Sequence, residues 1–121
     1  MAFQIEITPT ALDALKAVSD KRTQGAIVRR IDTLVQDPEK QGKLLRGWFS
    51  GFLSVRAAGQ RYRIVFKIDS SKQTVVVYMV GIRKEGSRKD IYALAERLVQ
   101  RGLLQEAEND YNQRNKRTDN G

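Results

Sequence analysis

The chain contains neither cysteine nor histidine among its 121 residues. Without cysteine there is no disulfide framework, no thiol nucleophile and no thiolate metal site. Without histidine there is no Ser-His or Cys-His catalysis, no zinc held by imidazole, and no general base of the kind usual near neutral pH. An enzyme built from this sequence therefore has to work with Lys, Arg, Tyr, Asp, Glu, Ser or Thr.

Long apolar segments are missing as well. No run of about 18 apolar residues is present, so the sequence predicts no membrane-spanning helix and no membrane partner. Residues 1–7 have neither the basic start nor the apolar stretch of a signal peptide, which makes the cytoplasm the expected location. A chain with 40% apolar and 30% charged residues is typical of a soluble globular protein.

Positive charge is abundant and unevenly placed. The formal net charge is +8, and the sequence pI is near 10. Residues 43–89 carry eleven Lys and Arg against two acids, a net charge of +9, whereas the rest of the chain sums to −1. Such a concentrated field favours a polyanionic partner such as nucleic acid. A merely solubilising surface is the alternative, although such surfaces usually mix both signs.

The apolar pattern predicts one short strand, two helices, three longer strands and a last helix. Alternation over 3–7 indicates a strand, and Thr8-Pro9 has the chemistry of a helix start. A second helix follows Ser19-Asp20, which offers its cap, and ends at Asp37-Pro38. Residues 43–47 fit either a brief strand or an extended entry to the sheet. The clear strands lie at 53–57, 62–68 and 74–82, and the last helix is expected to start at a Ser87 cap and to stop at Gly102.

The order β-α-α-β-β-β-α predicts an α+β fold. We expect a small antiparallel meander with the N-terminal αα-hairpin packed on one face, where the helices gather, and a C-terminal helix. The strand at 74–82 is almost continuously apolar, so it should be buried on both faces at the centre of the sheet. Residues 1–104 form the predicted domain, and the polar tail 105–121 is expected to be disordered in isolation.

The hairpin of 53–57 and 62–68 predicts a pair of facing arginines. If Ala57 pairs with Tyr62, Arg56 lies opposite Arg63. Like charges directly opposite one another destabilise a hairpin, so a chain that keeps them is expected to present them to an anion. Arg83, after the next strand, would complete a cluster of three guanidiniums, whose planar donors suit phosphate.

Proton transfer needs a further group near this cluster. Tyr92 is a candidate, because positive charge nearby favours a phenolate. Lys84, Glu85 and Ser87 are other candidates on residue type. The structural alternative for Tyr92 is that its ring only packs on the apolar edge of the last helix.

Several stretches resemble a known family. The most specific are RYRIVF at 61–66 and VGIRKE at 80–85, followed by Ile91-Tyr92. Over Phe3 to about Val99 the chain resembles the RelE/ParE superfamily of bacterial toxins from type II toxin–antitoxin systems. The Gly-x-Arg ending with a tyrosine downstream is more similar to the RelE/HigB side, which cuts mRNA on the ribosome, than to the ParE side, which inhibits DNA gyrase.

The resemblance implies a RelE-like toxin domain that enters the ribosomal A site and cuts the codon by attack of the RNA's own 2′-hydroxyl, without a metal or another cofactor. Its implied partners are mRNA, the ribosome and a cognate antitoxin. The implied catalytic residues are Arg63, Arg83 and Tyr92. The expected RNA-binding residues are Arg46, Arg56, Arg61, Lys67, Lys84, Arg88 and Lys89.

The chain also departs from RelE. Ser54 occupies a position where RelE has a lysine with a role in proton transfer, and the loop between Arg83 and Tyr92 is longer. A ParE-like gyrase inhibitor, and an inactive basic module that binds only nucleic acid or an antitoxin, are therefore the alternative functions.

Overall fold

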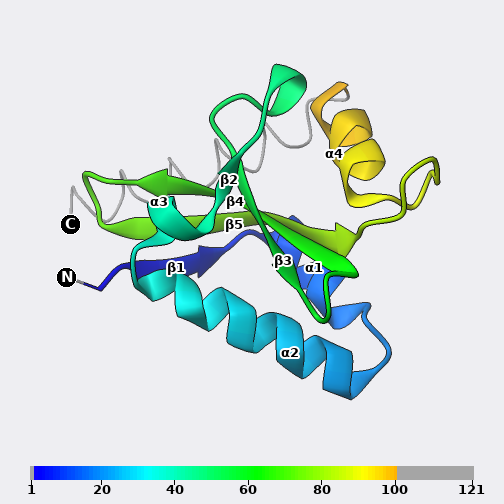
Figure 1. Cartoon of the computed structure of the whole chain (residues 1–121), viewed down its shortest axis with the longest axis horizontal. Coiled ribbons are helices and arrows are strands. Elements are labelled where there is room, and N and C mark those ends of the chain that lie inside the picture. The colour runs from blue at the N-terminus through cyan, green and yellow to red at the C-terminus, as the bar shows by residue number, and fades with distance from the viewer. Residues whose placement is uncertain (1, 101–121) are drawn as a thin grey trace.

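The computed structural model describes residues 2–100, except for the side chains of Trp48 and Val99. Helices cover a strongly twisted sheet (Figure 1). In chain order the elements are β1 (Gln4–Ile7), α1 (Pro9–Lys16), α2 (Lys21–Asp32), the 3-10 turn η1 (Thr33–Val35), α3 (Pro38–Gln41), β2 (Lys43–Leu44), the 3-10 turn η2 (Gly47–Phe49), β3 (Leu53–Ala57), β4 (Tyr62–Asp69), β5 (Thr74–Ile82) and α4 (Ile91–Gln100).

Within the described residues the sheet has five strands in the order β1-β5-β4-β3-β2. The strands from β2 to β5 form the predicted antiparallel meander. The predicted α+β fold is confirmed, but β1 runs parallel to β5, so the sheet is mixed and the antiparallel meander does not include β1. Parallel partners are joined by long crossovers rather than by tight turns, and such a pairing leaves no turn signal in the sequence.

The predicted hairpin register is confirmed. Ala57 pairs with Tyr62, and Arg56 lies opposite Arg63. The predicted burial of 74–82 on both faces is confirmed for residues 74–80. β5 lies between β1 and β4, so it is an interior strand, while β4 occupies the middle position.

Two apolar cores lie on opposite faces of the sheet. The first core contains Ala11 and Leu15 of α1, Ile27 and Ile31 of α2, and Val77 of β5. The second core lies under α4. Its buried residues are Phe52, Val65, Val76, Tyr78, Met79 and Ile91.

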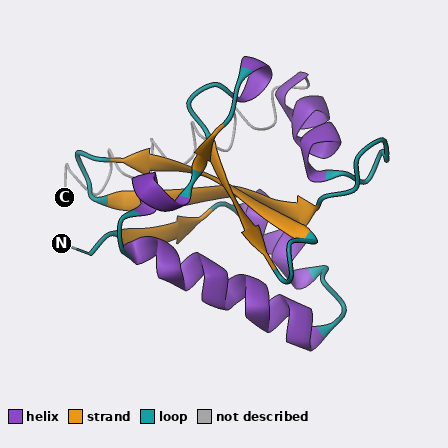
Figure 2. Cartoon of the chain, viewed as in Figure 1, coloured by secondary structure: helices purple, strands orange, loops and turns teal. Residues whose placement is uncertain are grey.

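The sequence predicted that the helices gather on one face of the sheet, and this prediction was wrong. α2 and α4 lie on different sides of the strands (Figure 2). The reason is β5, which is apolar on both faces and needs a cover on each. α4 packs closely against β5 at Gly81, where an added Cβ would lie only 2.8 Å from Cδ1 of Ile91.

A β-bulge in β5 changes which residues face α4. The register shifts between Val65 and Phe66, opposite the step from Met79 to Val77, so Tyr78 is the extra residue. Val76 and Tyr78 belong to the second core, and so does Met79 directly after them. Beyond the bulge the odd-numbered positions therefore face α4, and Arg83 falls on the same side of the sheet as Gly81.

Thr8 ties this bulge to the start of α1. Its Oγ1 accepts a hydrogen bond from the Ala11 backbone N–H at 3.2 Å and donates one to the Tyr78 carbonyl at 3.2 Å. The predicted Thr8 cap with Pro9 in the first turn is thus confirmed, as is an Asp20 cap on α2. The cap of α4, by contrast, is Asp90 and not Ser87. The Asp90 carboxylate accepts from the Tyr92 N–H, whereas the Ser87 hydroxyl accepts from the Lys89 N–H within the preceding turn.

The remaining expectations concern the end of the chain. The Gly102 stop, the domain boundary at residue 104 and the tail 105–121 lie outside the described residues. No described helix is long and apolar enough to cross a membrane.

Thr8→Val is predicted to destabilise the fold. The substitution keeps the side-chain shape but removes the hydroxyl, so the cap and the bond to the buried Tyr78 carbonyl are lost together. We expect the free energy of unfolding, measured in urea, to fall by about 2 kcal/mol. Thr10→Val, the same change at the second residue of α1, is the control and should cost about 0.5 kcal/mol or less. Equal losses in the two variants would contradict the role of the Thr8 hydroxyl.

Candidate active site

A cavity of about 360 Å³ opens between β2, β3, β4, the end of β5 and the start of α4. Four of its lining side chains are cationic, and a tyrosine and a serine supply hydroxyl groups. We call it the basic cavity. It is lined by Lys43, Leu45, Ser54, Arg56, Arg63, Arg83 and Tyr92.

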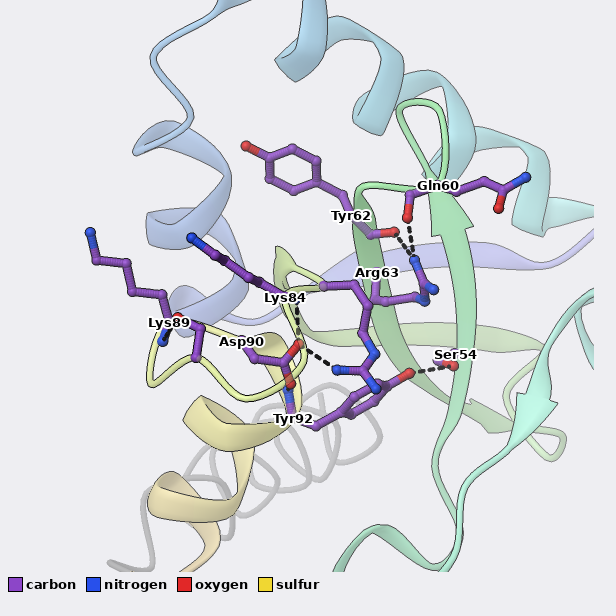
Figure 3. A network of polar contacts seen from close by, with 10 residues as sticks. Ser54, Gln60, Tyr62, Arg63, Lys84, Lys89, Asp90 and Tyr92 are labelled. Carbon is purple, nitrogen blue, oxygen red and sulfur yellow. Dashed lines mark hydrogen bonds and ion pairs between the residues drawn. The ribbon is translucent and has the colours of Figure 1, made fainter.

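The β3–β4 turn holds the two facing arginines. Nη1 of Arg63 donates to the carbonyl of Gln60 at 2.6 Å and to that of Tyr62 at 3.1 Å (Figure 3). Nη1 of Arg56 donates to Oε1 of the Gln60 side chain at 3.1 Å. The turn reaches this shape through positive φ angles at Ala58, Gly59 and Gln60. Backbone carbonyls and the Gln60 side chain therefore supply acceptors that offset the repulsion between like charges.

Arg83 enters the cavity from the end of β5 and is held by a buried carboxylate. Its Nη1 lies 2.7 Å from Oδ1 of Asp90, and the Lys84 backbone N–H donates to the same oxygen at 2.6 Å. The hydrogen bond to Asp90 raises the pKa of Arg83. Burial alone would raise the pKa of Asp90, but the hydrogen bonds from Arg83, Lys84 and Tyr92 outweigh it and lower that pKa below its ordinary value of 3.8.

Tyr92 packs and also presents its hydroxyl to the cavity. The Arg83 guanidinium carbon lies 5.1 Å from the centre of the Tyr92 ring, a cation–π contact, and the Phe49 ring lies 6.1 Å away on a tilted plane. The Tyr92 hydroxyl donates to Oγ of Ser54 at 3.1 Å (Figure 3). The ring thus packs at the edge of the second core, while the hydroxyl points towards β3.

The structure brings together four of the residues singled out from the sequence. Arg56, Arg63, Arg83 and Tyr92 line the basic cavity. The other expected RNA-binding residues do not line it. Lys67 lies over the Phe52 ring, with 4.5 Å between Nζ and the ring centre. The remaining five are exposed: Arg46, Arg61, Lys84, Arg88 and Lys89.

Sequence reasoning assigned no site role to Lys43, Ser54 or Asp90. Lys43 enters the cavity because the two-residue strand β2 pairs it with Ser54. A strand this short leaves almost no alternating pattern to detect. Asp90 did carry a signal, because an aspartate directly before the apolar stripe of a helix is a standard cap. The described residues contain no cluster of three or more acidic, cysteine or histidine side chains fit to hold a metal.

Residues 5–87 match the model of the ParE toxin of the type II toxin–antitoxin system parDE. The chain therefore belongs to the RelE/ParE superfamily of type II toxins. A search among curated proteins gave no match.

Solved structures show the same fold. The chain is 30% identical to a chain of the toxin–antitoxin complex RelBE2 from Mycobacterium tuberculosis, over 69% of this chain and all of that one, with a TM-score of 0.62. A free mutant of the toxin RelE from E. coli is 19% identical over 71% of this chain and 88% of its own, with a TM-score of 0.58. A YoeB/ParE toxin from Agrobacterium tumefaciens is 20% identical over 68% and 100%, with a TM-score of 0.57.

The Asp90 carboxylate predicts a specific dependence of stability on pH. Because its pKa is lowered in the folded state, its contribution is complete above the ordinary, unfolded-state pKa of 3.8. It is lost as the pH falls through the lower folded-state value. We expect wild type to be more stable than Asp90→Asn at neutral pH, and the gap to narrow between about pH 5 and pH 2. Urea unfolding of both proteins across this range measures the gap, and a gap that stays constant or widens in acid would contradict the assignment.

Proposed function

We propose that this toxin is a ribosome-dependent mRNA endonuclease that acts in the cytoplasm and inhibits translation. The observation that supports this proposal is the convergence of Lys43, Arg56, Arg63 and Arg83 with the Tyr92 hydroxyl on one cavity. Four cations around a small space suit a phosphodiester and the extra negative charge that it gains during cleavage. The likeness to RelE-type toxins supports the ribosome as the place where the RNA strand reaches the cavity.

The proposed chemistry needs no protein nucleophile. The 2′-hydroxyl of the RNA attacks the adjacent phosphorus, the bond to the 5′-oxygen breaks, and the products are a 2′,3′-cyclic phosphate and a 5′-hydroxyl. One proton leaves the 2′-oxygen and one reaches the 5′-oxygen. We propose that Arg63 and Arg83, which line the cavity together with Arg56, bind the non-bridging oxygens. Positioning and preorganised charge then supply most of the rate.

The groups available for proton transfer follow from the cavity lining. Tyr92, Ser54 and Lys43 carry its transferable protons. The Tyr92 hydroxyl is hydrogen-bonded to Ser54, at the position where RelE has a lysine. We propose that the tyrosine takes part in this proton transfer while its ring stays fixed by the Arg83 guanidinium.

The partner that controls this activity is proposed to be a cognate antitoxin. Residues 43–89 carry a net charge of +9, and a partner that inhibits the toxin has to bind over this charge. An antitoxin segment that lays carboxylates over Arg56, Arg63 and Arg83 matches that charge. Such a segment would be disordered alone and fold on binding, which lets a short chain cover a large surface.

Substitutions of the cavity arginines test the proposal. Arg63→Ala and Arg83→Ala should each lower the cleavage rate by roughly 10²–10³-fold, because each removes one preorganised charge contact. The measurement is primer extension on a translated mRNA with added protein. Arg22→Ala, which removes an exposed arginine at the start of α2, should leave the rate unchanged. Full activity in both cavity variants would place the chemistry elsewhere.

Tyr92→Phe separates the two roles of the tyrosine. The variant keeps the ring and its contact with Arg83 but loses the hydroxyl. If the hydroxyl moves a proton, cleavage should fall by at least about 10²-fold. The same primer-extension assay measures this effect, and a loss of less than about threefold would leave the ring with a stacking role alone.

The second candidate is a ParE-like inhibitor of DNA gyrase, which the match to the ParE toxin model favours. The two candidates differ in their target. A gyrase inhibitor lowers supercoiling in a purified gyrase reaction and leaves translated mRNA intact. That pair of results would replace the endonuclease proposal, and expression without growth arrest would favour an inactive binding module.

A further inference from the structure

Asp90 joins the two ends of the loop that separates the cavity arginine from the cavity tyrosine. Residues 84–89 lie between Arg83 at the end of β5 and Asp90 at the start of α4. Oδ1 of Asp90 accepts from the Arg83 guanidinium at 2.7 Å and from the Lys84 N–H at 2.6 Å. Oδ2 accepts from the Tyr92 N–H at 3.0 Å. One carboxylate thus holds the last strand, the loop and the last helix together (Figure 3).

The exposed fractions of the Arg83 and Asp90 side chains indicate which of the two a ligand would contact. The Arg83 side chain is 29% exposed, whereas that of Asp90 is 6% exposed. Asp90 does not line the basic cavity, while Arg83 and Tyr92 do. A substrate in the cavity would therefore contact the arginine and the tyrosine, and Asp90 would act on it only through them.

The contacts also restrict how Arg83 is oriented. A guanidinium has five N–H donors in one plane, so fixing Nη1 on a rigid acceptor limits the rotation of the whole group. The acceptor is rigid here because its other oxygen caps α4, which packs against Gly81 through Ile91. The Tyr92 ring then lies against the same guanidinium.

We propose that Asp90 is a positioning residue, which sets Arg83 and Tyr92 at a fixed separation and orientation for the reaction in the basic cavity. The loop 84–89 then only connects β5 to α4, since the contacts of Asp90 already hold the end of β5 and the start of α4 together. This inference rests on the proposed function for its kinetic test, because the fixed pair acts on the scissile phosphate.

Asp20 provides a matched control within the same chain. It caps α2 as Asp90 caps α4, and its carboxylate accepts from the Arg22 N–H and from the Thr23 hydroxyl. It is exposed and binds no cavity residue. Asp90→Asn and Asp20→Asn each exchange a capping aspartate for a side chain that still caps well. Only the first removes the charge that holds Arg83.

The kinetic test compares these variants in RNA cleavage with the full chain. We expect Asp90→Asn to lower kcat by about 10²-fold and to change KM by less than about threefold, because misplacement of the pair affects the transition state more than binding. Asp20→Asn should keep the wild-type kcat. Wild-type kcat in Asp90→Asn, or an equal loss in both variants, would overturn the inference.

A second measurement does not depend on RNA cleavage. In ¹⁵N-labelled wild-type protein the Arg83 guanidinium should give separate, slowly exchanging Nη signals, and in Asp90→Asn these should average while backbone amide signals outside 83–92 stay in place. Unchanged Arg83 signals would overturn the inference whatever the activity. If wild type does not cleave translated mRNA, the proposed function fails, and the guanidinium signals alone decide the role of Asp90.

Discussion

Burial of β5 on both faces is the constraint on which the rest of the structure depends. Residues 74–80 are all buried, so neither face of this strand can be left to solvent. α1 and α2 cover one face and α4 covers the other, while β1 and β4 occupy its two edges. The basic cavity lies at the end of this strand, where Arg83 follows β5 and α4 begins on the face that carries the second core.

The bulge at Tyr78 decides what this end of β5 presents. Strict alternation from Val76 would direct Arg83 to the first core, where an unpaired cation would be costly. One extra residue turns it instead to the face that carries Ser54, Arg56 and Arg63. Bulges are common beside active sites because they redirect side chains in this way. Thr8 binds the bulged segment twice, since its hydroxyl donates to the Tyr78 carbonyl and its backbone N–H donates to the Val77 carbonyl.

The cavity holds several cations close together, and the structure shows how their mutual repulsion is offset. Each arginine has its own acceptor. Arg63 uses carbonyls of the β3–β4 turn, Arg56 uses the Gln60 side chain, and Arg83 uses Asp90. These acceptors fix the guanidiniums before any anion arrives, so binding need not order them. A type II toxin without histidine, cysteine or an acidic metal cluster in the described residues thus still holds a preorganised cluster of guanidiniums.

Local patterns in the sequence determined much of the fold. Alternation and turn chemistry predicted the β3–β4 register and the pair Arg56–Arg63, and the caps at Thr8 and Asp20 followed from residue type. These features depend on neighbours close in the chain, and so a single sequence can reveal them. Only the tertiary structure decided the parallel pairing of β1 with β5, the division of the helices between two faces, the bulge that turns Arg83, and the meeting of Lys43, Ser54 and Asp90 with the arginines. Most of these join segments far apart in sequence or depend on one extra residue in a strand, and apolar periodicity carries no information about either. Asp90 and Arg83 are only seven residues apart, but their contact depends on how the loop between them folds.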